Sequence, residues 1–223
     1  MVLRRSIPAT ASVVKKMNGD RLHSPAAAKN VGHITELVCS VSPKHGTALE
    51  IASGTGQHII KLAAVTPNLT WQPSDIDTAR LNSIVSWSFE KQLPNLLPPI
   101  KLDVTDEGWS ALCPNQDLIL LVNLLHLVSE SEAKVIIDGI SKSLMPGGRC
   151  VIYGPFMRDG FLTSDGDKCF HQSLVEADPD IGYKDDKWML DMFQNYNLEI
   201  VKIANMPANN LAFVIEKNHL KHS

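Results

Sequence analysis

One stretch, residues 50–58 (EIASGTGQH), limits what this chain can fold into more than any other. An apolar run at residues 47–51 leads into it, Gly54 and Gly56 lie in its middle, and apolar residues recur at 59–63. This order predicts a buried strand, a tight turn and a helix. Glycines let the backbone reach positive φ and approach a ligand, and a helix N-terminus offers unpaired N–H groups. The stretch is therefore a candidate binding turn for a nucleotide-like ligand.

The rest of the chain continues this alternation of strands and helices. Residues 117–122 (DLILLV) are continuously apolar, as expected for a central strand covered on both faces. The further predicted strands are 69–73, 100–102 and 150–153, followed by 198–204 and 211–216, whose short connection favours an antiparallel hairpin. Pro73 predicts the end of its strand. We therefore predict an α/β, Rossmann-like fold with a seven-stranded, mostly parallel sheet, a C-terminal antiparallel hairpin and helices on both faces.

Several helices carry local start signals. Ser24 and Pro25 suit the N-cap and first helical position of a helix that either packs on the sheet edge or covers a ligand. Ser129 and Glu132 have capping-box spacing. A helix with a narrow apolar face is predicted from Leu81, Ile84, Val85 and Ser88. Two more helices are expected within the excursion at residues 157–195, near 170–175 and 188–193.

Composition limits the class of protein. At 223 residues and 44% hydrophobic, the chain suits one domain, predicted at residues 21–217, with a flexible arm at 1–20 and a tail at 218–223. A net charge of −3 without a Lys/Arg-rich run predicts no nucleic-acid partner. Scattered cysteines without a CxxC pair predict neither a metal site nor disulfides, and no apolar run is long enough for a membrane span. A cytoplasmic protein is expected.

The ligand of the glycine turn is narrowed by its surroundings. In a doubly wound sheet, ligands bind beyond the carboxyl ends of the strands, and Asp75 follows the turn at the spacing at which a carboxylate meets ribose hydroxyls. Asp77 is the alternative. A dinucleotide fingerprint would place a third glycine where this chain has Ile59. With Glu50 opening the motif and no Arg or Lys in the turn, a cationic sulfonium ligand with an amino-acid tail fits better than a pyrophosphate.

Together, the ExxxGxG pattern, Asp103 after the third strand, LMPGGR before the fifth strand and the terminal hairpin resemble a class I S-adenosylmethionine-dependent methyltransferase. More narrowly, residues 21–217 resemble the DUF938 family. The motifs that carry this narrower resemblance are SPAAAKN, EIASGTGQH, LTWQPSDID, YGPF, DGFLTS and MPANNL. The chain departs from the family where it has Asp165-Gly166 and Lys184-Asp185.

The resemblance implies a set of cofactor-binding residues. The turn, with Glu50, Ser53, Gly54 and Gly56, would hold the methionine part of S-adenosyl-L-methionine, and Asp75 would hold the ribose. The adenine edge would be bound by Asp103 and Val104. Asn123 and His126 occupy positions where the family has an Asn followed by a His.

The acceptor side is less determined. His126 is a candidate general base because its reference pKa lies near neutrality, although a His packed at the start of the next helix is an equal interpretation. Tyr153, Phe156 and Arg158 either line the acceptor pocket, with Arg158 as an anion anchor, or are core and surface residues. Asn209 and Asn210 suit a turn for local reasons, and only the resemblance suggests that they bind substrate.

These residues predict a methyltransferase that acts on a small-molecule O, N or S nucleophile. Residues 123–126 read NLLH and do not resemble the (N/D)PP(Y/F) tetrapeptide of methyltransferases that modify nucleic-acid bases. A non-catalytic cofactor-binding or interaction protein with the same fold is the alternative, and a nicotinamide-dependent oxidoreductase is disfavoured by Ile59. The sequence leaves a homodimer open.

Overall fold

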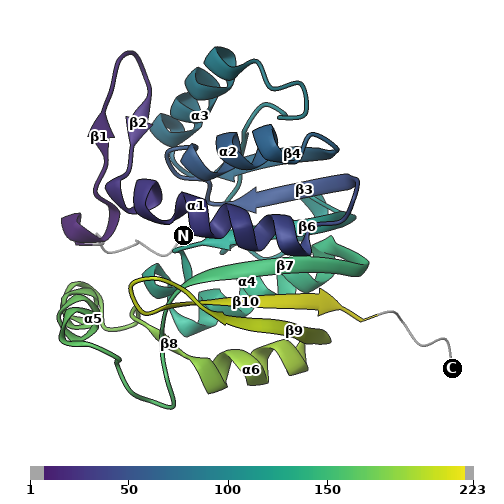
Figure 1. The fold of residues 1–223 in the computed structure, drawn as a ribbon. Helices are drawn as coiled ribbons and strands as arrows, with labels where there is room; N and C mark the ends of the chain where they lie inside the picture. Colours follow the sequence, from purple (N-terminus) through teal and green to yellow (C-terminus); the bar gives the residue numbers. More distant parts are fainter. Residues whose placement is uncertain (1–7, 219–223) are drawn as a thin grey trace, which may run out of the picture.

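The structure is a computed structural model that describes residues 8–218, and its centre is one twisted sheet (Figure 1). Seven of its strands lie side by side in the order β5-β4-β3-β6-β7-β10-β9, and β8 pairs with the end of β7. All are parallel except β10, which runs antiparallel to both neighbours. The strands are β3 (Gly46–Ile51), β4 (Leu69–Asp75), β5 (Ile100–Lys101), β6 (Gln116–Val122), β7 (Leu144–Met157), β8 (Lys184–Asp185), β9 (Leu198–Asn205) and β10 (Asn210–Lys217). The predicted α/β sheet with a terminal hairpin is confirmed.

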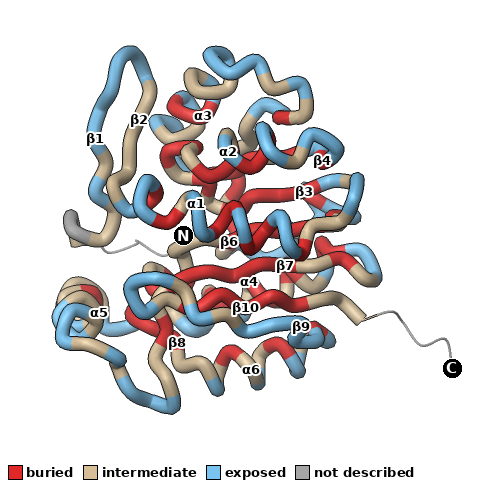
Figure 2. The backbone as a smooth tube through the Cα atoms, viewed as in Figure 1, coloured by how far each residue is buried: buried red, intermediate tan, exposed pale blue. Residues whose placement is uncertain are grey.

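Helices cover both faces of this sheet, with the core between the layers (Figure 2). One face packs against α1 (Pro25–Val41), α2 (Gln57–Val65) and α3 (Thr78–Lys91). The other packs against α4 (Glu130–Ser143), α6 (Asp186–Asn195) and the short helix η2 (Trp109–Leu112). Strand β6 is central: Leu118 and Leu120 contact the first layer, Ile119 and Leu121 the second, and all four are fully buried. Its continuous apolar run follows from this double coverage.

The helix starts predicted at Ser24 and Ser129 are confirmed by their caps, and the helix predicted near residues 170–175 begins earlier. The Ser24 hydroxyl accepts a hydrogen bond from the Ala27 N–H at the start of α1, with Pro25 in the first turn. Ser129 and Glu132 form a complete capping box at α4. Helix α5 (Asp165–Ala177) begins after Ser164, whose hydroxyl accepts from the Asp167 N–H. Local polar side chains thus set these boundaries.

Three local predictions were wrong. Strand β4 does not end at Pro73 but continues to Asp75, because Trp71 already pairs with residues 95–97 on the outer side, where the missing proline N–H is tolerated. Strand β7 begins at residue 144 rather than 150, because Leu144 pairs with Gln116 of β6 and, after a register shift, residues 149–155 pair with β6 or β10. Val85 is 51% exposed, and α3 buries Ser83 beside Ile84 instead.

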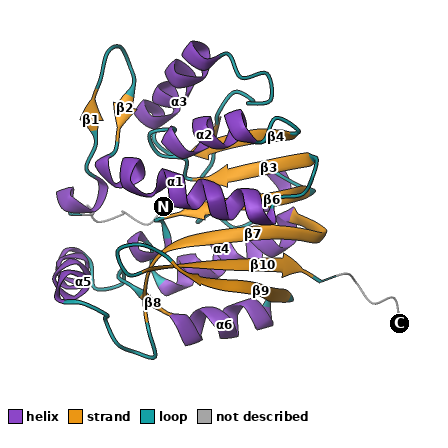
Figure 3. Cartoon of the chain, in the orientation of Figure 1, coloured by secondary structure: helices purple, strands orange, loops and turns teal. Residues whose placement is uncertain are grey.

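The N-terminal region has more structure than the predicted arm. It contains the short helix η1 (Ala9–Ser12) and the paired strands β1 (Lys15–Lys16) and β2 (Leu22–His23). The β1–β2 hairpin and α5 both project from the end of the molecule where the parallel strands finish (Figure 3). Residues 1–7 and the end of the predicted tail, 219–223, lie outside the described residues, so the domain boundaries remain predictions. No helix within residues 8–218 is long and apolar enough to cross a membrane.

Candidate functional site

The glycine turn joins β3 to α2 and contains three residues with positive φ at alternate positions. Ala52, Gly54 and Gly56 have φ of 52°, 58° and 90°. Gly56 is the N-cap of α2, and a Cβ there would lie 3.1 Å from Cγ1 of Ile84. Its lack of a side chain therefore lets α2 begin directly against α3. Ala52 holds a left-handed conformation that is uncommon for a residue with a Cβ.

Asp75, at the end of β4, faces this turn. Its carboxylate accepts hydrogen bonds from the Gly54 N–H and the Asp77 N–H, each at 2.9 Å. Burial raises its pKa, while these two N–H groups and Arg80, whose Nη1 lies 3.9 Å from Oδ2, act against the increase. Asp77 is engaged differently, because it caps α3 by accepting from the N–H groups of Ala79 and Arg80. The structure thus separates the two carboxylates by role.

Glu50 is a second buried carboxyl at the turn. It is 1% exposed, and among residues 8–218 its Oε2 has no hydrogen-bond partner. Burial raises its pKa to about 8, an effect that Ser53 opposes and the charge of Asp75 reinforces. A buried carboxyl oxygen without a donor is costly to a folded chain. A cationic ligand with N–H groups would complete this group.

Ser53 ties the ends of β3 and β4 together. Its N–H donates to the Ser74 carbonyl at 2.7 Å, and its hydroxyl donates to the Glu50 carbonyl at 3.2 Å. The Ser74 hydroxyl donates to the same carbonyl at 2.9 Å. The Ser53 side chain therefore fixes the turn. Its predicted role in cofactor binding stays a prediction.

Asp103 and Val104 follow β5 at the next strand end. Asp103 accepts hydrogen bonds from the N–H and hydroxyl of Thr105, at 3.0 and 2.6 Å, which closes a tight turn. Val104 is buried in the same hydrophobic cluster as Leu102. Because β5 pairs with β4 at Asp75, these residues continue the row of strand ends that begins at the glycine turn.

Asn123 and His126 follow the central strand. Asn123 has φ of 53°, and its N–H donates to the Tyr153 carbonyl at 2.8 Å. His126 lies in the short helix η3 (Leu125–Leu127), with its ring edge-on to Phe170 and Tyr183. Burial, helped by the positive charge of Lys184, lowers the pKa of His126 to about 3. The imidazole is therefore neutral at physiological pH and weakly basic.

Tyr153 and Phe156 point into different layers. Phe156 packs edge-on against Phe213, with ring centroids 5.0 Å apart, on the α4 side of the sheet. Tyr153 is buried on the α1 side, where it shares a hydrogen bond with Asn30. Asn30 in turn contacts Nε2 of His58 at 2.8 Å. The structure does not bring the two aromatic side chains together.

Asn30, His58 and Arg80 were missed as site residues. Asn30 ends the motif SPAAAKN and His58 ends EIASGTGQH, so both lay within motifs that the sequence singled out. Burial lowers the pKa of His58 to about 4, so it is a neutral member of a buried network joining α1, α2 and β7. Only tertiary packing shows that these distant residues meet.

Arg158, Asn209 and Asn210 surround the tip of the β9–β10 hairpin. Arg158 donates to the carbonyls of Phe156 and Asn209, both at 3.0 Å, while Asn210 donates to carbonyls within its own turn. The Asn209 amide donates to Asp167 at 3.1 Å. Burial favours the neutral form of Asp167, but hydrogen bonds from four side chains outweigh it and lower its pKa. Asp167 thereby joins α5 to the hairpin.

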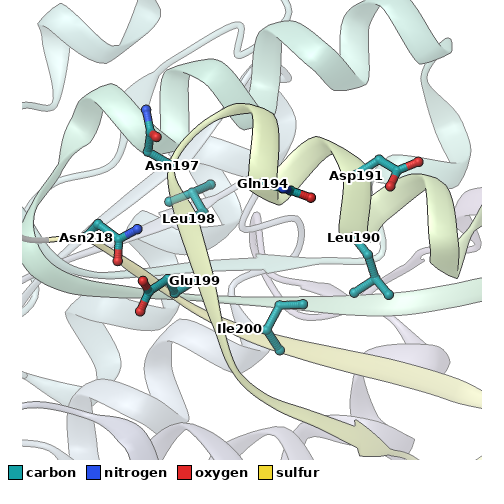
Figure 4. Close-up of a pocket in the computed structure, with 8 residues that line it drawn as sticks. All are labelled: Leu190, Asp191, Gln194, Asn197, Leu198, Glu199, Ile200 and Asn218. Atoms are coloured by element: carbon teal, nitrogen blue, oxygen red, sulfur yellow. The ribbon is translucent and has the colours of Figure 1, made fainter.

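Two surface hollows lie away from this site. One, of about 430 Å³, separates α6 from β9 and is lined by residues including Leu190, Gln194 and Ile200 (Figure 4). The other, of about 420 Å³, lies beside η2 and α4 near Tyr196. Neither contains a residue of the glycine turn. Within residues 8–218, no group of three His, Cys, Asp or Glu side chains could hold a metal ion.

Solved structures with the same fold are methyltransferases. An O-methyltransferase family protein from Burkholderia thailandensis matches at TM-score 0.75 and 16% identity, over 88% of this chain and 57% of that one. Human N-acetylserotonin methyltransferase, solved in complex with SAM, matches at 0.71 and 14%, over 87% and 53%. An O-methyltransferase family 2 protein from Planctomyces limnophilus DSM 3776, in complex with apigenin, matches at 0.70 and 16%, over 86% and 60%.

At these identities the likeness establishes the fold, and this chain spans little more than half the length of those proteins. The sequence itself gives the family. Residues 21–217 match the family described as "Protein of unknown function (DUF938)". That match covers most of the chain and coincides with the sheet and both helical layers. The chain belongs to the DUF938 family, and its fold is that of the methyltransferases.

Proposed function

We propose that this protein is an S-adenosylmethionine-dependent methyltransferase. The observation that carries the proposal is the pair of buried carboxyls at the glycine turn, one of which, Glu50, has an oxygen without a partner in the described chain. S-adenosylmethionine is a cation with an ammonium group and a ribose diol, and its sulfonium carries the methyl group that a nucleophile receives. Acidic side chains beside a glycine turn suit that chemistry, whereas a pyrophosphate would meet two carboxylates and a bulky Ile59.

Each chain segment supplies one part of the cofactor site in this proposal. Glu50 accepts from the ammonium group, and the turn at Gly54 and Gly56 lies along the methionine part. Asp75 accepts from the ribose hydroxyls, because a carboxylate can accept from two vicinal donors. Asp103 and Val104 at the next strand end bound the adenine. The structure of human N-acetylserotonin methyltransferase, which contains SAM, supports this assignment at the level of the shared fold.

The acceptor is proposed to be a small molecule that reacts through O, N or S. For His126 we propose a hydrogen-bonding role toward the acceptor rather than the storage of its proton, because an imidazole with a pKa near 3 is a poor base at neutral pH. Arg158, Asn209 and Asn210 bound the acceptor side at the tip of the β9–β10 hairpin, where Asn209 contacts the first turn of α5. Tyr153 holds α1 against β7, and Phe156 holds the β9–β10 hairpin against β7 through Phe213. The chain's task is orientation and exclusion of water.

Isothermal titration with S-adenosylhomocysteine tests the cofactor assignment. We expect one site per chain and competition by S-adenosylmethionine. A well-folded protein that fails to bind either compound would contradict the proposal. Binding without methyl transfer to any acceptor in cell extract or in a panel of phenols, amines and thiols would favour the non-catalytic alternative.

A further inference from the structure

The N-terminal segment, residues 8–24, is attached at its C-terminal end to the glycine turn itself. The Leu22 N–H donates to the Ser83 hydroxyl at 2.9 Å, and that hydroxyl donates to the Thr55 carbonyl at 2.9 Å. The side chain of Gln57 accepts both from the Ser24 N–H and from the Thr55 hydroxyl. We call residues 8–24 the strap. Its fixed end therefore shares hydrogen-bonding groups with the turn between Ser53 and Gly56.

The same end of the strap also lies along α3. The Trp87 indole N–H donates to the Leu22 carbonyl at 3.2 Å, and the Arg21 guanidinium lies over the Trp87 ring and pairs with Glu90. The β1–β2 hairpin then extends outward, with Lys15 and Lys16 exposed at its edge. These contacts are polar and partly exposed, unlike the apolar packing that holds α1 and α2 on the sheet. Contacts of this kind can open locally without unfolding the domain.

The N-terminal end of the strap contacts both sides of the site. The Arg80 guanidinium donates to the Ser12 hydroxyl and also lies beside Asp75, the proposed ribose ligand. The preceding residue, Ala11, packs against the cluster of Leu174, Ile181 and Tyr183. Tyr183 is in turn in edge contact with His126. Two adjacent residues therefore connect the cofactor side at α3 with the acceptor side at α5.

This placement is visible in Figure 1, where the short purple helix lies between the β1–β2 hairpin and α5. Since Asp75 and His126 follow different parallel strands, a chain that contacts neighbours of both must pass across the row of strand ends. That row is where ligands bind in an open α/β sheet. The strap thus lies across the proposed site.

We infer that the strap is a hinged lid over the cofactor site, closed by a latch between Ser12 and Arg80, and that it sets how fast the bound cofactor product leaves. The inference rests on the proposed function for the identity of the ligand. The hinge is residues 15–20, the outer strand and turn of the β1–β2 hairpin, since both ends of the strap are held and these residues between them are exposed. In the closed lid, Ser12 lies on the cofactor side beside Arg80, and Ala11 lies on the acceptor side against the cluster that contains Tyr183.

The test compares the full-length parent protein with Ser12→Ala and with Val13→Ala as the matched control. Val13 is adjacent to Ser12 but 50% exposed, so its truncation leaves the latch intact. The release rate of S-adenosylhomocysteine is measured by stopped-flow displacement with excess S-adenosylmethionine. Trypsin cleavage after Lys15 and Lys16 is followed by mass spectrometry, with and without S-adenosylhomocysteine.

We expect Ser12→Ala to release S-adenosylhomocysteine roughly tenfold faster, the effect of losing one hydrogen bond to a charged group. The ligand should slow cleavage at Lys15 and Lys16 in the parent and in Val13→Ala, and much less in Ser12→Ala. Equal release rates and equal protection in all three proteins would overturn the lid. Failure of the parent to bind S-adenosylhomocysteine would instead contradict the proposed function, and the lid with it.

Discussion

Two carboxyl groups define the site at the scale of single residues, and their surroundings give them different properties. Asp75 keeps two backbone N–H partners and a nearby Arg80, so its ionised form is supported despite burial. Glu50 is fully enclosed with one oxygen lacking a partner in residues 8–218, and its pKa is about 8. The first is a ready acceptor for hydroxyl groups, and the second is a group that a cationic ligand would ionise.

Asp75→Asn should weaken S-adenosylhomocysteine binding by roughly 10- to 100-fold, because it removes charge-assisted hydrogen bonds to the ribose. Asp77→Asn is the matched control, since Asn caps a helix about as well as Asp and α3 should remain intact. Titration calorimetry and thermal unfolding of both variants check this. If the Asp77 variant loses affinity as strongly as the Asp75 variant, the ribose role does not belong to Asp75.

Glu50 should lose a proton when ligand binds. At pH 7 a carboxyl with a pKa near 8 is mostly protonated, and an adjacent ammonium group favours the charged form. Binding of S-adenosylhomocysteine at pH 7 should therefore release close to one proton per site. Calorimetry in phosphate and in Tris, whose ionisation enthalpies differ, measures the release. Glu50→Gln should bind more weakly and release none, and proton release that persists in this variant would assign it to another group.

At the scale of elements, α5 is joined to the rest of the chain through its first turn. Asp167 accepts from Thr163, Ser164 and Tyr183 and from Asn209 of the hairpin. The hydrophobic cluster that α5 joins, with Leu174, Ile181 and Tyr183, has far fewer buried residues than either of the two main clusters. Polar contacts at Asp167 therefore add to this small apolar cluster in attaching α5.

Asp167→Ala should loosen α5 without disturbing the sheet. It removes the acceptor of Tyr183 and Asn209, whose hydrogen bonds are part-buried and exposed, respectively, and are worth about 0.5–1.5 kcal/mol each. Hydrogen exchange followed by mass spectrometry should show faster exchange in residues 158–177 and unchanged exchange in β6 and β7. Asp165→Ala is the control, because Asp165 lies in the same turn but its side chain is 95% exposed. Identical exchange in the two variants would show that Asp167 does not hold the helix.

At the scale of the whole molecule, buried titratable groups make stability depend on pH. The pKa of Glu50 is raised from 4.5 to about 8, so the stability present below 4.5 is lost as the pH rises through 8. The pKa values of His58 and His126 are lowered from 6.5 to about 4 and 3, so their contribution is lost as the pH falls below 6.5. Between pH 6.5 and 7.5 the two histidines are neutral in the folded state but still bind protons in the unfolded state, so their effect on stability opposes that of Glu50.

In that interval Glu50 alone should lower the free energy of unfolding by roughly 1 kcal/mol per pH unit, a contribution that is isolated by comparing the parent protein with Glu50→Gln. Urea denaturation at about pH 6.5, 7.0 and 7.5 measures how the free energy of unfolding changes with pH. The slope in Glu50→Gln should be more positive than in the parent by roughly 1 kcal/mol per pH unit, because glutamine does not titrate and the histidines remain. Equal slopes in the parent and in Glu50→Gln would show that Glu50 is already ionised in the folded state.

The sequence by itself determined the order of strands and helices, because strand and helix periodicity, caps and the glycine turn are local signals. Ser24, Ser129 and the run at 117–122 predicted their elements for that reason. The resemblance supplied the identity of the candidate site, and its motifs contain both Asn30 and His58. What only the tertiary structure decided are contacts between residues distant in sequence.

The choice of Asp75 over Asp77 is one such case, since it depends on which carboxylate meets Gly54 and which caps α3. The separation of Tyr153 from Phe156 is another, because alternation along β7 sends them to opposite layers of the core. The strap is a third: residues 8–24 carry little periodic pattern, and their position follows from partners on α3 and α5. Such contacts are set by the packing of the whole chain, which no local pattern encodes.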